Sequence, residues 1–156
     1  MRRLTAVLCI CLGCGPRPAA TNADVEELLR GHELARRAHL EHRADLMTSG
    51  FADTVIQIAR GEVTTGTPEQ GRARFQRYFD RSTFLAWDDI APPIIHISPD
   101  GRMAWKVVRK RVGLTAPDST GRLVEEHTIF AWVEILEKLD GRWKLVAVAS
   151  TDRPGP

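Results

Sequence analysis

Apolar side chains recur at helical spacing over residues 25–47, and this pattern predicts one long amphipathic helix. At 100° per residue the apolar positions fall within an arc of about 140°, while charged residues occupy the opposite side. Thr21 or Asn22 supplies the expected N-cap, and Ser49-Gly50 ends the helix. The chain therefore begins its folded part with a helix that needs an apolar surface to cover.

The rest of the pattern predicts one further helix and several strands. Thr67 and Pro68 open the second helix as its cap and first residue. Period-two alternation and β-branched residues predict strands over residues 54–63, 83–89, 94–98, 103–112, 124–139 and 143–150. Residues 99–102 (Pro-Asp-Gly-Arg) and 140–141 (Asp-Gly) predict hairpin turns, and Pro92-Pro93 predicts a bend.

Helix, strand, helix and then an antiparallel meander is the order of an α+β fold. To bury the apolar face of the long helix together with the inner strand faces, the sheet must curve. We predict a cone-shaped domain in which a curved mixed or antiparallel sheet wraps around the long helix and one or two shorter ones.

The N-terminus has the pattern of a signal peptide. Arg2 and Arg3 precede an apolar run over residues 4–12, and nine residues are too few to span a bilayer as a helix. Gly13-Cys14 resembles the lipobox of bacterial lipoproteins, although Cys11 stands where leucine is usual. We expect residues 1–13 to be removed, Cys14 to be lipidated, residues 14–22 to form a tether and residues 23–153 to form the domain.

This interpretation places the domain in the cell envelope, facing the periplasm or the outside, as an outer-membrane lipoprotein. The alternative is a plain signal peptide cut near Gly15 or Ala20, which gives a secreted protein. The residue after Cys14 is Gly15 rather than aspartate, so the resemblance implies no inner-membrane retention. Contact with a membrane is expected only through the lipid.

Composition and charge change after this removal. The chain of 156 residues has 43% hydrophobic residues, 27% charged residues and a net charge of +2, with 22 basic and 20 acidic side chains. Losing Arg2 and Arg3 leaves 20 of each, so no basic excess argues for a nucleic-acid partner. Cys9 and Cys11 are also lost, so Cys14 has no partner for an internal disulfide and the core must hold the fold.

Five sequence phrases together resemble the nuclear transport factor 2-like superfamily, in its SnoaL-like branch, over about residues 24–153. They are Asp45-Leu46, Gly50-Phe51-Ala52-Asp53, Thr67-Pro68-Glu69, Asp100-Gly101-Arg102-Met103-Ala104 and residues 140–146 (Asp-Gly-Arg-Trp-Lys-Leu-Val). The resemblance implies a cystatin-like cone fold and a homodimer formed through the outer sheet face. It implies no single chemistry, because members include isomerases, cyclases, dehydratases and non-catalytic binders.

Several polar residues lie on faces that should be apolar. His39 and Arg43, together with His32 and Arg36, fall inside the apolar arc of the helix, where they either line a polar cavity or reach along its rim. Arg109 shares a strand face with Trp105 and is either an inward cation or part of a solvated strand end.

On the next long strand, His127 aligns with apolar residues, which suits a core histidine or a pocket residue. Glu134 beside Trp132 is either an interior carboxylate or the rim of a dimer face, and the rim is the preferred interpretation. His39, His42 and Asp45 diverge around the helix, so neither a metal site nor a cofactor is predicted.

Isomerase chemistry can be tested against the ketosteroid isomerase relatives within the superfamily. Alignment on Phe51-Ala52-Asp53 places Ile58 where those relatives carry the general base, and Arg37 where they carry a tyrosine. Neither residue supplies what the role needs, and the oxyanion-hole acid maps only loosely near Glu134. The sequence therefore leans away from an enzyme of this type.

Three hypotheses follow for the domain. The first is a binder of a small apolar or anionic molecule, oriented by Arg43, Arg109 and His39 and walled by the aromatic residues Phe51, Trp105 and Trp132. The second is a cyclase or dehydratase with His39 or His127 as general base. The third is a non-catalytic adaptor that dimerises through the outer sheet face.

Overall fold

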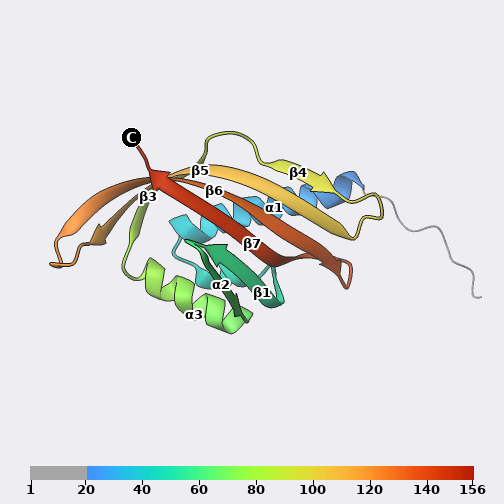
Figure 1. Ribbon diagram of the computed structural model, residues 1–156, viewed down its shortest axis with the longest axis horizontal. Helices are drawn as coiled ribbons and strands as arrows, with labels where there is room; N and C mark the ends of the chain where they lie inside the picture. The colour runs from blue at the N-terminus through green and yellow to red at the C-terminus, as the bar shows by residue number, and fades with distance from the viewer. Residues whose placement is uncertain (1–20) are drawn as a thin grey trace, which may run out of the picture.

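The computed structural model describes residues 21–156, so the predictions for the signal peptide, Cys14 and most of the tether lie outside the described residues. The predicted α+β architecture is confirmed. A large curved sheet arches over the helices, which lie on its concave side (Figure 1). The elements are α1 Asn22–Leu40, α2 Ala44–Thr48, β1 Phe51–Ala59, β2 Glu62–Gly66, α3 Pro68–Phe79, β3 Thr83–Asp89, β4 Ile94–Ile97, β5 Met103–Pro117, β6 Leu123–Leu139 and β7 Arg142–Pro154.

The sheet is mixed and unclosed, with strand order β2-β1-β7-β6-β5-β3 and β4 paired to β5 beside β3. Only the β1–β7 pair is parallel; all the other pairs of the described sheet are antiparallel. Strands β5 and β6 pair along their length, from Met103 opposite Glu137 to Pro117 opposite Leu123. The hairpin between β6 and β7 turns at Asp140-Gly141, where both residues have positive φ, as predicted for this dipeptide.

The single long helix predicted over residues 25–47 is wrong in one respect, because the chain breaks it after Leu40. His42 adopts a left-handed φ of 54°, and the Arg43 amide bonds back to Ala38 O, which ends α1 and turns the chain into the short helix α2. Helix α2 then packs against α3 instead of continuing along the sheet. In a continuous helix Arg43 would lie within the apolar arc, but the turn moves it out of that arc.

The strand predicted over residues 54–63 is likewise two strands joined by a tight turn. Arg60 and Gly61 both have positive φ, and they reverse the chain between β1 and β2. Helix α3 begins as predicted, with a capping box in which Thr67 and Gln70 each bond to the other's backbone amide.

Two apolar clusters fill the concave side of the sheet. The first joins Phe79 of α3 and Phe84 and Trp87 of β3 to the end of β5, and it is mostly aromatic. The second joins Leu28 of α1 to Leu136 and Trp143 of the β6–β7 hairpin. Within residues 21–156, no helix has the length and apolarity needed to cross a membrane.

Candidate functional site

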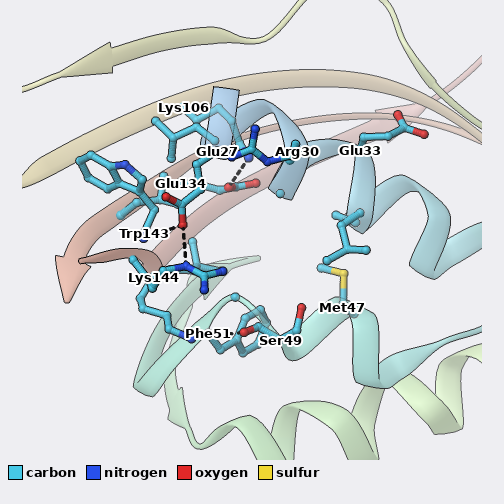
Figure 2. A pocket seen from close by; sticks show the side chains of 18 of the residues that line it. Glu27, Arg30, Glu33, Met47, Ser49, Phe51, Lys106, Glu134, Trp143 and Lys144 are labelled. Carbon is cyan, nitrogen blue, oxygen red and sulfur yellow. Dashed lines mark hydrogen bonds and ion pairs between the residues drawn. The ribbon is translucent and has the colours of Figure 1, made fainter. Parts of the chain in front are cut away.

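A pocket of about 670 Å³ opens between α1, the loop before β1 and the strands β5–β7 (Figure 2). Its walls carry Leu28, Leu34, Met47, Phe51, Leu136, Trp143 and Leu145. Phe51, predicted as an apolar wall, therefore does line a pocket, although most of the other wall residues were missed. The volume and the apolar lining are those of a small-molecule site.

An ion pair lies inside this pocket, on the concave face of the sheet. Lys106 Nζ lies 2.8 Å from Glu134 Oε2, and the two side chains are 4% and 17% exposed. Trp132 Nε1 donates a hydrogen bond of 2.8 Å to the other carboxylate oxygen, Oε1. Lys106 and Glu134 stand directly opposite each other in the β5–β6 register, so their side chains share one face.

A second buried ion pair lies beyond the pocket, where β5 pairs with β3. Lys110 is fully buried, and its Nζ lies 2.8 Å from Asp89 Oδ1. His32 of α1 approaches the same carboxylate, with Nε2 2.9 Å from Oδ2. Burial lowers the pKa of His32, although its hydrogen bond to Asp89 acts in the opposite direction. Burial alone would raise the pKa of Asp89, but the contacts with Lys110 and His32 outweigh it and hold this pKa below its usual range.

These pairs correct the expectation for β5. The inward face carries Ala104, Lys106, Val108 and Lys110, whereas Trp105 and Arg109 point outward and are exposed. Trp105 stacks on His96 of β4 with ring centroids 5.1 Å apart, so it forms no wall of the cavity. The lysine face of β5 points inward because the carboxylates of Glu134 and Asp89 lie on the inner face of the sheet. Each forms an ion pair with a lysine on the neighbouring strand.

Arg43, the other predicted ligand-binding cation, also lies away from the pocket. Its guanidinium forms two short hydrogen bonds to Asp45, at 2.8 and 2.6 Å, on the exposed side of the α1–α2 turn. The helix break at His42 causes this position. Trp132 does point inward, but it reaches the pocket only through its hydrogen bond to Glu134. Glu134 is thus an interior carboxylate and not the rim group that was preferred.

The two histidines considered as general bases lie outside the pocket. His39 is 3% exposed in the aromatic cluster, stacked on Trp87 with centroids 3.5 Å apart, and its Nδ1 donates to Ala35 O at 2.7 Å. Burial lowers its pKa to about 4, so the ring is neutral at pH 7. His127 is exposed at the far end of β6, where Nε2 lies 2.9 Å from Glu125. The five histidines of the chain all fall within the described residues, and this pocket is lined by none of them.

The pocket lining is charged. Apart from the internal pair, it includes Arg30, Arg37, Arg142 and Lys144, and the three arginines are paired with Glu26, Glu41 and Glu27 respectively. Lys144 Nζ donates to Ser49 O at 3.3 Å and has no ion pair among the described residues. No cluster of three metal-binding side chains was found in residues 21–156.

Comparisons with known proteins agree with this architecture. No protein-family model matches the sequence, and no curated protein matches it. Among solved structures, the chain is similar to a ketosteroid isomerase-like protein from Erwinia carotovora atroseptica, with 11% identity, a TM-score of 0.66 and coverage of 86% of this chain and 100% of that one.

Two further solved structures have a similar fold. An NTF2-like protein from Cytophaga hutchinsonii is 18% identical with a TM-score of 0.63, over 85% of this chain and 98% of that chain. A protein with a cystatin-like fold from Nostoc punctiforme is 14% identical with a TM-score of 0.58, over 88% and 97%. The chain has the fold of the nuclear transport factor 2-like superfamily, as the sequence resemblance implied.

Proposed function

We propose that this domain binds a small molecule with an apolar body and an anionic group, in the pocket between α1 and the sheet. The observation that carries the proposal is the combination of an apolar-lined cavity of about 670 Å³ with Lys144 in its lining, a cation that has no ion pair among the described residues. Apolar walls stabilise the body of such a ligand, and the ammonium of Lys144, which has no ion pair among the described residues, attracts and orients its anion. Lys144 is proposed to hold the anion, in place of Arg43 and Arg109, because Arg142 is already paired with Glu27 Oε1 at 3.1 Å.

The location proposed for this binding is the cell envelope. The basic start, apolar run and Gly13-Cys14 of the sequence support export and lipid attachment at Cys14. Replacement of Cys14 by serine should release the protein from the membrane fraction. An unchanged fractionation would remove lipidation from the proposal while leaving the pocket untouched.

The binding test uses an apolar anion, 1-anilinonaphthalene-8-sulfonate, whose fluorescence rises in an apolar site. The pocket offers a clean blocking position at Gly31 of α1, because a Cβ added there meets no atom within 4 Å. Gly31→Leu places a bulky side chain at the pocket lining, starting from this open space, and should abolish probe binding. The matched control Gly31→Ala keeps the pocket open, so its affinity should match that of the unsubstituted protein.

The anionic part of the proposal needs its own variant. Lys144→Gln should weaken binding of the probe by about 1 kcal/mol, which is a roughly fivefold higher Kd, because a charge-assisted contact to the anion is lost. Arg109→Gln removes a cation from the convex face, outside the pocket, and should leave the affinity unchanged. If Gly31→Leu binds the probe as well as Gly31→Ala does, the pocket is not the site and the proposal fails.

A second candidate, a homodimer formed through the convex sheet face, is favoured by one observation. Trp105 and Val107 are 38% and 37% exposed there, opposite Ile135 and Val133 in the register, so an apolar strip crosses the middle of the face. Sedimentation equilibrium at micromolar concentration should give a dimer that Val107→Lys converts to a monomer. A monomer before substitution would sink this candidate.

A further inference from the structure

Lysine is rare in this chain, and two of the four lysines are buried on the inner face of the sheet. Of the 22 basic residues only four are lysines, at positions 106, 110, 138 and 144, and the other 18 are arginines. Lys106 and Lys110 are 3% and 0% exposed. Arginine is the usual partner for a buried carboxylate, since its planar guanidinium bonds to both oxygens. A primary amine can do what a guanidinium cannot, which is to act as a nucleophile.

The two buried amines differ in what they can reach. Each lies 2.8 Å from one carboxylate oxygen, Lys106 from Glu134 and Lys110 from Asp89. Lys106 and Glu134 both line the pocket, whereas Lys110 and Asp89 do not. Lys106 is thus an amine that a ligand in the cavity can meet, beside a carboxylate able to carry a proton (Figure 2).

We propose that Lys106 is a covalent site at which an aldehyde or ketone bound in the pocket forms a reversible imine. The proposal rests on the proposed binding function and adds the chemical class of the ligand, a carbonyl compound. Glu134 is the proton carrier for this step, and Trp132 is a positioning residue that holds the carboxylate by its hydrogen bond of 2.8 Å.

The step balances without any oxidant or reductant. A bound ligand covers the part of the ion pair that is still exposed, so both charges lose their remaining hydration, and Glu134 takes a proton from the Lys106 ammonium. The neutral amine attacks the carbonyl carbon, a C–N bond forms, and the proton left on nitrogen moves to oxygen to give a carbinolamine. Glu134 returns its proton to the hydroxyl, water leaves, and a protonated imine remains paired with the carboxylate.

The experiment traps this species in the full-length protein. The protein is incubated with 3-phenylpropanal and sodium cyanoborohydride at neutral pH, and the reduced adduct is located by peptide mass mapping. Lys106 should carry at least about tenfold more adduct than Lys110, which is the matched control because it is a buried, carboxylate-paired amine outside the pocket. The carboxylate 3-phenylpropanoate has no reactive carbonyl and should protect Lys106 by competition.

Two substitutions separate the roles. Lys106→Arg keeps the charge and should remove the adduct, while Glu134→Gln should slow its formation by about a hundredfold, the lower range for loss of a general base. Protection by 3-phenylpropanoate is measured on the unsubstituted protein, so the proposal remains testable if either variant fails to fold. Labelling that is confined to Lys138 and Lys144, or that 3-phenylpropanoate does not reduce, would overturn the imine.

The same ligands distinguish this failure from failure of the binding function. If 3-phenylpropanoate displaces 1-anilinonaphthalene-8-sulfonate but the aldehyde leaves Lys106 unmodified, the pocket binds and the imine proposal alone is refuted. If Gly31→Leu binds the probe as well as Gly31→Ala does and no adduct forms at Lys106, both proposals fail together.

Discussion

Acid should destabilise this fold through one buried histidine, and His39→Asn isolates the effect. His39 lies in the aromatic cluster with its ring 3.5 Å from that of Trp87, and burial lowers its pKa from 6.5 to about 4. Asparagine cannot titrate in this range, but its side-chain amide can replace the Nδ1 donor that bonds to Ala35 O at 2.7 Å. The comparison of the two proteins therefore removes the proton and keeps the donor.

The magnitude follows from the two pKa values of His39. Above pH 6.5 the ring is neutral in both the folded and the unfolded protein, so its titration contributes nothing to stability. As the pH falls below 6.5, His39 binds a proton in the unfolded chain but stays neutral in the folded one. The free energy of unfolding therefore decreases until about pH 4, where the folded protein also binds the proton. At pH 5 the loss is about 2 kcal/mol, and below pH 4 it reaches about 3 kcal/mol.

The assay is urea unfolding at pH 7.5 and pH 5, followed by circular dichroism. At pH 7.5 His39→Asn should be less stable by about 2–3 kcal/mol, because the ring contacts with Trp87 and its neighbours are lost. At pH 5 this difference should shrink by about 2 kcal/mol. His127→Asn at the exposed end of β6 serves as the surface control, with an expected change below about 0.5 kcal/mol at each pH. An advantage of the unsubstituted protein that stays constant between the two pH values would refute the reasoning.

Three other substitutions test the packing around the pocket. Gly31→Ala should raise the free energy of unfolding by about 0.5–1 kcal/mol in urea titrations, since helix propensity improves and the new Cβ meets no atom within 4 Å. Gly71→Ala in α3 should instead lower it by about 1 kcal/mol, because its Cβ would lie 3.2 Å from Phe51 Cε2; a stabilising result would show that Phe51 moves freely. Asp24→Asn should cost about 2 kcal/mol in the same titrations, since the buried carboxylate bonds to Lys138 and Trp143. Because those contacts hold the pKa of Asp24 far below its usual range, this loss should fade in strong acid, and the exposed Asp45→Asn should leave the unfolding midpoint nearly unchanged.

Local signals in the sequence were enough to predict the cap of α3 and the turn between β6 and β7. Thr67 and Gln70 form the capping box at α3, and Asp140-Gly141 turns the β6–β7 hairpin with both residues at positive φ. Each of these features is determined by a few residues that are neighbours in the sequence, so it can be predicted without knowing the tertiary structure. The break after Leu40 was missed because Leu46 and Met47 continue the apolar arc, and no glycine or proline marks the turn at His42.

The site was harder to predict, because it depends on which face of β5 points inward. The two faces are chemically balanced: Trp105, Val107, Arg109 and Arg111 alternate with Ala104, Lys106, Val108 and Lys110. Periodicity alone cannot choose between faces that each carry two apolar and two cationic side chains. The choice is made by Glu134 and Asp89, 28 and 21 positions away from their respective lysines, and only the strand register brings them together.

The two interior ion pairs also act as a check on how the long strands align during folding. β5 pairs with β6 over fifteen positions, and antiparallel strands of this length offer many shifted alignments. A slip by one residue would turn both lysines to the other face, and a slip by two would set Lys106 opposite Trp132 or Leu136. On the other side of β5, a shift in the β3–β5 register would likewise separate Lys110 from Asp89. A sheet slipped by two residues that still closes around α1 would bury the Lys106 ammonium opposite an uncharged side chain, so this ion pair also penalises that misalignment.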